Sequence, residues 1–282
     1  MTLPSHEKIR EIEPSSRLYV ENEVSYMTAT ILAHADAPNP SAESLTFVLT
    51  ARGLVTMRYA ELRPMASYAA RLMRHPAVAA SGEDVLVGLL ESFVDRIADV
   101  LEKVALDLDH LSQSIFDGGT STSRARAGQR DPQAVLKILG RNEDITSTAR
   151  ESLLSMIRLI RFISPTLESP HRRSSKELRA RIKTVRADIA SLSEHAAFES
   201  HTVNFLLDAT LGMINIEQNR IIKIFSIVAV IFLPPTLVAS LYGMNFRYMP
   251  ELDWSLGYPV AIALMLLSAV LPLLYFRRKG WM

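Results

Sequence analysis

The side chains with the clearest chemical potential lie on one face of a single helix near the carboxyl end of the chain. They are spaced alternately four and three residues apart, so they share a helical face. We call this set the polar stripe; it contains Asp208, Gly212, Asn215, Asn219, Ile222, Ser226, Ala229, Leu233, Thr236, Ser240 and Gly243. Most of its members are small or polar, and the positions between them are mostly bulky and apolar. In a bilayer such a stripe indicates either close helix packing or a water-filled path, and the pattern alone leaves both open.

The helix that carries the polar stripe belongs to one of two segments long enough to cross a membrane. No charged residue occurs from Ile224 to Phe246 or from Trp254 to Phe276, and about 20 apolar residues span the hydrocarbon core. The short loop between them holds Glu251 and Asp253, whereas basic residues flank the outer ends of the pair. The positive-inside rule therefore predicts that both termini are cytoplasmic and that the acidic loop is external.

Composition excludes several classes of protein. The chain has 282 residues, with 31 basic against 30 acidic side chains, so it lacks the basic excess typical of nucleic-acid binders. It contains no cysteine, which excludes disulfides, thiolate metal sites and cysteine nucleophiles. No nucleophile–base arrangement or phosphate-binding glycine loop occurs, so we expect no enzyme and no ATP requirement.

The part of the chain before the two spans predicts an α+β domain with long helices. Strands are predicted at 25–32, 45–50 and 54–59, joined by short polar or glycine-containing turns. From Asp84 the apolar spacing becomes helical, and a second helix at about 132–163 is expected to stop before Pro165. A third helix starts near 175 and runs without a linker into the first span, so we predict one helix from about 175 to 242.

These patterns divide the chain into six predicted parts. The parts are a small α/β domain at 1–83, an antiparallel helical hairpin at 84–174, a stalk helix continuing into the first span at 175–246, an external loop at 247–255, a second span at 256–276 and a basic tail at 277–282. A soluble domain joined rigidly to a membrane helix suggests mechanical coupling between the two.

A sequence motif closes the first span. The chain reads Tyr242-Gly-Met-Asn-Phe246, followed by Met249-Pro-Glu-Leu252. These motifs, with the surrounding residues from about 200 to 282, resemble the CorA family of magnesium and cobalt transporters. The resemblance is weaker but collinear back to about residue 15. The family's amino-terminal domain is usually longer, so we expect a smaller sheet here.

The resemblance implies a funnel-shaped homopentamer in the inner membrane with the first span of each subunit around one axial pore. The pore would be lined by Asn219, Ile222, Ser226, Ala229, Leu233, Thr236 and Ser240, and the selectivity motif would be Gly243, Met244 and Asn245. It further implies influx of Mg²⁺, with Co²⁺ as a second substrate, and closure of the pore by cytosolic Mg²⁺. Mg²⁺ would thus be both substrate and regulator, with no other cofactor.

The individual residues also have ordinary structural interpretations. Magnesium dehydrates reluctantly, so rings of amide and hydroxyl oxygens suit a hydrated ion. Asn245 could supply one such amide, but it also fits the position of a helix cap. Glu251 and Asp253 either concentrate cations at the mouth or are solvated, and Ile222 and Leu233 either gate the pore or pack. Candidate cytosolic metal ligands are Asp208, Asp84 and Glu91. His195 and Glu199 form the one helical pair suited to a metal.

Two other functions remain as alternatives. A zinc transporter of the same superfamily would share the architecture, although its motif usually departs from Met at the middle position. A membrane-anchored scaffold or sensor would use the two spans only as a tether and would need no polar stripe. The sequence does not distinguish Mg²⁺, Co²⁺, Ni²⁺ and Zn²⁺ as the physiological ion, or an open state from a closed one.

Overall fold

The structure is a computed structural model of the chain. It describes residues 14–37, 40–75, 80–116, 131–168, 176–245, 249–250 and 254–281. The chain divides into two compact units, Met1–Thr210 and Leu211–Met282. The predicted loop tip at 117–131 and the connection at 165–175 fall mostly outside the described residues.

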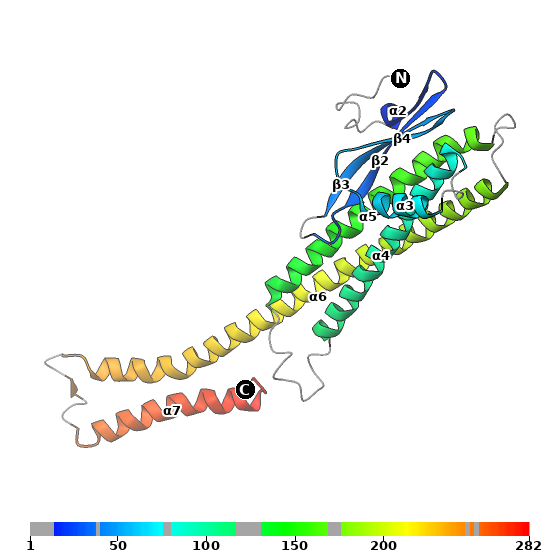
Figure 1. Ribbon diagram of the computed structural model, residues 1–282. Coiled ribbons are helices and arrows are strands. Elements are labelled where there is room, and N and C mark those ends of the chain that lie inside the picture. Colours follow the sequence, from blue (N-terminus) through cyan, green and yellow to red (C-terminus); the bar gives the residue numbers. More distant parts are fainter. Residues whose placement is uncertain are drawn as a thin grey trace. The chain divides into compact units, whose positions relative to one another are not determined.

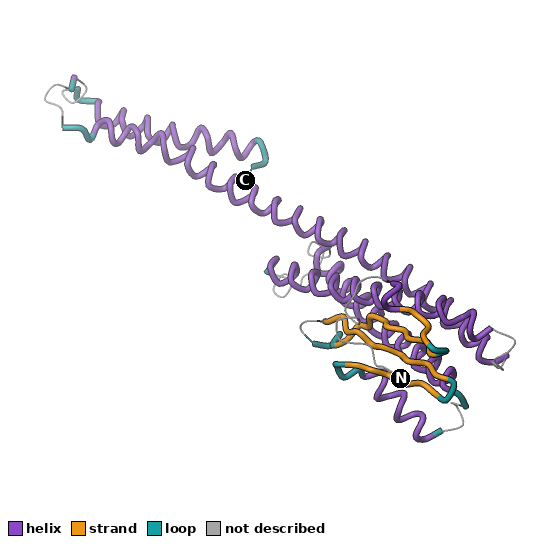
Figure 2. The backbone as a smooth tube through the Cα atoms, turned by 90° about the horizontal axis from the view of Figure 1, so that it is seen from above, coloured by secondary structure: helices purple, strands orange, loops and turns teal. Residues whose placement is uncertain are grey.

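The first unit contains a four-stranded antiparallel sheet (Figure 1). Its strands follow the order of the sequence: β1 (Leu18–Glu21), β2 (Val24–Ala33), β3 (Ser41–Thr50) and β4 (Gly53–Arg58). Strands β2, β3 and β4 occupy the three predicted stretches, and β1 adds a short edge strand that the sequence did not predict. Figure 2 shows the strands gathered into one layer against the helices of this unit.

Alternation along the strands gives the sheet an apolar face and a hydroxyl-rich face. Met27, Ala29 and Ile31 of β2 are fully buried in the hydrophobic core together with Phe47 of β3. On the other face the hydroxyls of Thr28 and Thr46 lie 2.9 Å apart, within hydrogen-bonding distance. Both faces are closed to solvent, because Thr28 and Thr46 are also buried, at 7% and 1% exposure.

Helix α5 (Pro132–Glu168) also completes the hydrogen bonding of the sheet. Strand β1 pairs with β2 only as far as Met27, so later β2 amides on that side need other acceptors. The backbone amide of Thr30 donates to Ser155 Oγ of α5 at 2.8 Å. Arg17, the last residue of the short α2 (Pro14–Arg17), donates to the Thr30 hydroxyl at 3.0 Å.

Helix α3 (Arg63–Arg74) was not predicted from the sequence. It begins with a proline in its first turn and packs on α4 (Gly82–Phe116). Tyr68 of α3 is buried against Gly88 of α4, where an added Cβ would lie 2.3 Å from the Tyr68 hydroxyl oxygen. Glycine at position 88 is therefore what lets α3 approach α4 this closely.

Helices α4, α5 and α6 (Lys176–Tyr242) form the rest of the first unit's core. The helical apolar spacing predicted from Asp84 is confirmed as a buried face of α4, which includes Phe93 and Leu101, and α6 buries a similar face with Val185 and Ile189. The prediction that the second helix stops before Pro165 was wrong, because α5 continues to Glu168. Leu167, in the turn after the proline, is 1% exposed, and its burial offsets the hydrogen bond that the proline removes.

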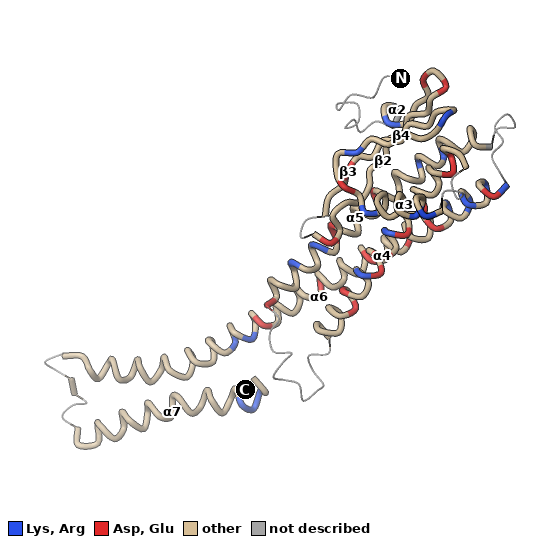
Figure 3. The backbone as a smooth tube through the Cα atoms, viewed as in Figure 1, with Lys and Arg blue, Asp and Glu red and all other residues tan. Residues whose placement is uncertain are grey.

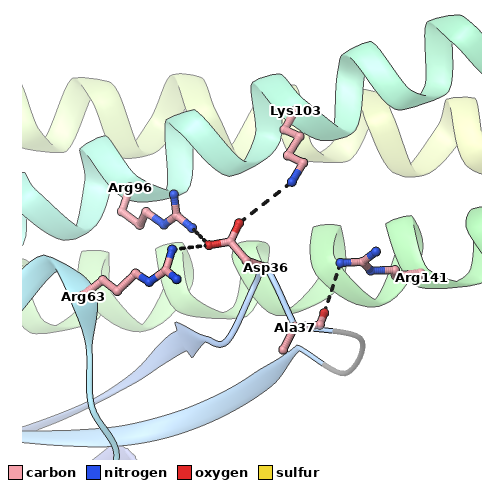
Figure 4. Close-up of polar contacts among 6 residues, drawn as sticks. All are labelled: Asp36, Ala37, Arg63, Arg96, Lys103 and Arg141. Carbon is pink, nitrogen blue, oxygen red and sulfur yellow. Dashed lines mark hydrogen bonds and ion pairs between the residues drawn. The ribbon is translucent and has the colours of Figure 1, made fainter.

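Asp36, just after β2, links the sheet to two helices (Figure 4). Its Oδ2 lies 2.6 Å from Arg63 of α3 and 2.6 Å from Arg96 of α4, and its Oδ1 is 3.9 Å from Lys103 of α4. Next to it, Arg141 of α5 donates to the Ala37 carbonyl at 3.1 Å. The loop after β2 thus contacts α3, α4 and α5 through side chains that carry a charge.

The second unit contains the carboxyl-terminal part of α6 and α7 (Gly257–Arg278). Among the described residues, α6 and α7 are the two helices long and apolar enough to cross a membrane. Figure 3 shows charged residues concentrated in the first unit and recurring at the carboxyl end of α7. The prediction of two membrane-length helices is confirmed.

We expect Asp36→Ala to destabilise the first unit by about 1–2 kcal/mol, because it removes two short hydrogen bonds between charged groups at a partly exposed site. Thermal unfolding of the detergent-solubilised chain, followed by circular dichroism, measures the change. Glu43→Ala, which removes another carboxylate of the sheet, is the control. An unfolding temperature equal to that of the unsubstituted protein would contradict the role assigned to Asp36.

Candidate functional site

The candidate site begins where α6 ends. The amide of Gly243 still donates to Ala239 O at 2.9 Å, as in a helix, and the Met244 amide makes only a longer contact of 3.4 Å to Leu241 O. A Cβ at position 243 would lie 3.0 Å from Ala239 O. Glycine therefore lets the helix end tightly at this point without displacing its last turn.

The rest of the predicted selectivity motif follows at once. Met244 and Asn245 are both exposed in the single chain, Met244 at 46%. The predicted external-loop carboxylates Glu251 and Asp253 lie outside the described residues. The motif thus presents an amide and a thioether at the end of a membrane-length helix.

The residues predicted to line a pore share one property: each is exposed in the single chain. They are Asn219, Ile222, Ser226, Ala229, Leu233, Thr236 and Ser240. The face of α6 that is covered within this unit is a different one, with Ile227 buried at 6% exposure. Large apolar residues such as Phe225 and Phe232 are exposed too. Exposure therefore leaves the polar stripe available for protein or water, but does not by itself distinguish it from a lipid-facing surface.

Two hydroxyl groups of the polar stripe, those of Ser226 and Thr236, are satisfied within their own helix. Ser226 Oγ donates to Ile222 O at 2.8 Å. Thr236 Oγ1 lies 2.9 Å from Phe232 O and 2.8 Å from Leu233 O. Each hydroxyl donates its hydrogen to the backbone and keeps its oxygen lone pairs as acceptors. This arrangement suits a surface that contacts bound water.

The two prolines of α6 modify the backbone next to Thr236. Pro234 and Pro235 lie inside the helix; having no amide hydrogen, they leave the carbonyls of Val230 and Ile231 without the usual helical donors. Free carbonyl oxygens in a membrane-length helix need water or a neighbouring protein group. The prolines therefore place acceptors at the level of the polar stripe.

Two of the predicted metal ligands are engaged by one arginine. Arg181 of α6 donates from Nε and Nη2 to the two carboxylate oxygens of Glu91, at 2.8 and 2.7 Å, and its Nη1 lies 3.9 Å from Asp84. Asp84 also accepts from Ser81 at the start of α4. The hydrogen bonds to Glu91 are the largest cause of the raised pKa of Arg181. Within one chain these acids neutralise an arginine and hold α4 to α6.

Asp208, the third predicted ligand, lies elsewhere. It is exposed on α6, 27 residues beyond Arg181, which corresponds to about 40 Å along a helix. The structure therefore does not bring Asp208 together with Asp84 and Glu91 in one chain. Among the described residues, no group of three or more His, Asp and Glu side chains could hold a metal ion.

A buried carboxylate lies between Arg181 and Asp208 on α6. The side chain of Glu199 is 2% exposed, and His195 Nε2 approaches its Oε1 at 2.9 Å. Burial raises the pKa of Glu199 from 4.5 to about 7. The pairing of His195 with Glu199 predicted from their spacing is present, but as a contact with a buried acid and without further metal ligands nearby in the described residues.

Sequence reasoning missed the polar layer around Glu199. The next residue, Ser200, donates to Glu143 of α5 at 2.8 Å, which places this turn of α6 beside the α5 turn that holds Asn142 and Thr146. Both of these side chains are nearly inaccessible, at 2% and 1% exposure. The available signal was the occurrence of polar residues at positions of the helical spacing that are otherwise apolar.

Comparison with protein families gives one match over nearly the whole chain. Residues 2–278 match the family described as CorA-like Mg²⁺ transporter protein. A "Magnesium transport protein CorA" from Yersinia pseudotuberculosis is 38% identical over 282 residues, covering 100% of this chain and 85% of that protein. The protein of that name from Escherichia coli K12 is 35% identical over 281 residues, with the same two coverages.

Solved structures show the same fold at low sequence identity. The complete CorA magnesium transporter from Methanocaldococcus jannaschii superposes with a TM-score of 0.71 at 18% identity, over 94% of this chain and 80% of that one. The full-length CmaX protein gives a TM-score of 0.67 at 19% identity, over 95% and 79%.

The buried acid predicts a pH-dependent stability. Because the folded-state pKa of Glu199, about 7, lies above the unfolded value of 4.5, the folded state binds more protons between these values. The free energy of unfolding should therefore fall as the pH rises from about 4.5 to 7, by up to about 3 kcal/mol. Glu199→Gln should remove most of this fall, which thermal unfolding of the full chain between pH 5 and pH 8 measures.

Glu194→Gln is the matched control, because Glu194 is an exposed acid on the same helix. It should keep the pH dependence of the unsubstituted protein. A Glu199→Gln variant with an unchanged pH profile would show that Glu199 is not the group responsible.

Proposed function

We propose that this chain, which belongs to the family of CorA-like Mg²⁺ transporter proteins, conducts hydrated Mg²⁺. The path would be an axial pore between several copies of the chain. The observation that carries this proposal is the exposed polar stripe of α6, which ends in Gly243, Met244 and Asn245. A CorA-type transporter needs a polar path through the membrane, and this stripe supplies one. Co²⁺, which is also divalent and hydrated in water, is proposed as a second substrate on the family resemblance.

The polar stripe requires more than one chain. Two membrane-length helices cannot enclose a path, and polar groups in a bilayer must face protein or water. A symmetric ring of subunits with α6 innermost satisfies both conditions. We propose a homopentamer on the family resemblance, with the seven stripe residues from Asn219 to Ser240 facing the axis.

The chemistry of the stripe suits a hydrated ion. Mg²⁺ keeps its water unless several carboxylates replace it, and the stripe offers neutral oxygens: the Asn219 and Asn245 amides and the hydroxyls of Ser226, Thr236 and Ser240. A ring of Asn245 amides can hydrogen-bond to the hydration shell without holding the ion too tightly to leave. The bulkier Ile222 and Leu233 are proposed to form narrow apolar rings that gate the path.

The membrane potential is sufficient to drive influx. A divalent ion that crosses 100 mV gains about 4.6 kcal/mol, twice the value for one charge. We propose that both termini are cytoplasmic in the plasma (inner) membrane and that Glu251 and Asp253 raise the cation concentration at the outer mouth. Mg²⁺ bound at cytoplasmic acids would close the pore.

Asp208 is the strongest candidate for that regulatory site. It is exposed and belongs to the polar stripe, so copies from several subunits would repel one another unless a cation bound between them. Asp84 and Glu91 are weaker candidates, because Arg181 already compensates their charge. Their regulatory role would require a neighbouring subunit to displace the arginine.

We expect Asn245→Ala to reduce Mg²⁺ uptake at least tenfold, because it removes the amide ring at the pore mouth. The assay is uptake into proteoliposomes under an inside-negative potential, followed by an internal Mg²⁺ indicator. Asn204→Ala is the matched control: Asn204 is an exposed asparagine of α6 in the first unit. Zinc uptake that follows a proton gradient, without Mg²⁺ uptake, would instead assign the chain to zinc transport. No flux of any cation would support a tethered scaffold.

We expect Asp208→Asn to weaken inhibition by internal Mg²⁺ at least fivefold while uptake at low internal Mg²⁺ is retained. Removing a negative charge from each subunit lowers the affinity for a bridging cation. Uptake measured as a function of internal Mg²⁺ tests this, with Glu194→Gln as the control acid on the same helix. Inhibition that responds to Glu91→Gln but not to Asp208→Asn would move the regulatory site to the arginine-paired acids.

A further inference from the structure

The chain folds back on itself just after α7. The amide of Trp281 donates to Phe276 O at 3.0 Å, and that of Gly280 donates to Arg277 O at 3.2 Å. Gly280 has a positive φ of 67°, which completes the Schellman arrangement of a helix end. The Trp281 ring consequently stacks on Phe276, with the ring centroids 5.5 Å apart. The indole is thus fixed at the carboxyl end of a membrane-length helix.

Two ammonium groups converge on this indole from different helices. Lys223 of α6 places its Nζ 4.9 Å from the centre of the Trp281 ring, and Lys279 places its Nζ 5.2 Å from the same centre. Lys279 also donates to the Tyr275 hydroxyl at 3.3 Å. Each contact is a cation–π interaction. The attraction of each ammonium group to the ring therefore offsets part of the repulsion between the two like charges.

In the described part of the second unit, acidic side chains do not balance the positive charge at this end of α7. Lys223, Arg277, Arg278 and Lys279 supply four cations. Within the described residues between 211 and 281, the one acid is Glu217, whose carboxylate lies 3.5 Å from Arg220. The described side chains of this unit thus offer these four cations no carboxylate, and an anion from another molecule can bind them.

The surroundings favour a lipid as the source of that anion. The four cations lie where the apolar stretches of α6 and α7 end, beside the rings of Tyr275, Phe276 and Trp281. Aromatic rings and basic side chains at a helix end are typical of the headgroup layer, where clustered cations attract acidic lipids. A soluble anion would gain nothing from the adjoining apolar surface.

We propose that Lys223, Arg277, Arg278, Lys279 and Trp281 form a binding site for the headgroup of an anionic phospholipid. Trp281 holds the two lysines in place, and their remaining N–H groups, with the two guanidinium groups, contact the lipid phosphate. The site joins α6 to α7 through the lipid. It depends on insertion of both helices in a bilayer and not on ion conduction.

Trp281 provides the probe. The chain has two tryptophans, so Trp254→Phe leaves Trp281 as the single indole. The full chain carrying this substitution is reconstituted into phosphatidylcholine that contains an increasing mole fraction of brominated phosphatidylglycerol. In the converse series, it is reconstituted into phosphatidylglycerol that contains an increasing mole fraction of brominated phosphatidylcholine. Quenching of Trp281 fluorescence gives the relative binding constant of the two lipids. We expect about tenfold preference or more for phosphatidylglycerol, weakened by high salt.

Substitutions then identify the site. Lys223→Gln with Lys279→Gln, and separately Arg277→Gln with Arg278→Gln, should each lower the preference severalfold. Lys183→Gln with Arg186→Gln is the matched control, since it removes two exposed positive charges from α6 in the first unit. If a double variant fails to fold, Lys223→Gln alone and the salt titration of the parent protein still provide the test.

Three results would overturn the proposal. Equal quenching by the two lipids would show no headgroup preference. A preference that survives loss of all four cations would place the lipid elsewhere. Complete reversal of the preference by inorganic phosphate at constant ionic strength would identify a soluble anion as the ligand.

Discussion

The carboxyl-terminal part of this protein is governed by the requirement that every polar group inside a bilayer finds a partner. Helices satisfy this for their backbone, but α6 adds hydroxyls and two prolines to an apolar span. Ser226 and Thr236 donate to carbonyls of their own helix, which satisfies the hydroxyl hydrogen but leaves acceptor lone pairs. The prolines leave further carbonyls free. These acceptors require water or another protein group inside a bilayer, and the proposed pore between several copies of the chain would supply both.

The first unit is subject to a different constraint, because its small sheet must be held on long helices. Burial of the apolar side chains of the sheet supplies most of the attraction, and charged contacts link the sheet to individual helices. Asp36 connects the β2–β3 loop to α3 and α4, whereas Glu91 and Arg181 connect α4 to α6. Because α6 belongs to both units, changes in the packing of the first unit bear directly on the helix that carries the polar stripe. The proposed closure of the pore by cytoplasmic Mg²⁺ would use α6 as this shared element.

The charged groups of the chain separate into those that serve the fold and those left for ligands. Asp84 and Glu91 are engaged by Arg181, and Glu199 is buried with a raised pKa. Asp208 and the four cations around Trp281 are available to other molecules. The availability of a charge, more than its residue type, separates a candidate binding residue from a structural one.

The sequence by itself determined the two membrane-length helices, the strands β2 to β4, the buried stripes and the motif that led to the family, because each is a local pattern with a fixed period or a fixed order. It failed at α3, at the end of α5 and at the polar layer around Glu199. There, contacts between distant residues decided the outcome: Gly88 admits Tyr68, and burial of Leu167 carries α5 past Pro165. The partner of Glu91 lies 90 residues away, and nothing in a local pattern selects Arg181 among the arginines of α6. Only the tertiary structure brings such pairs together, because the free energy that favours them comes from packing between elements.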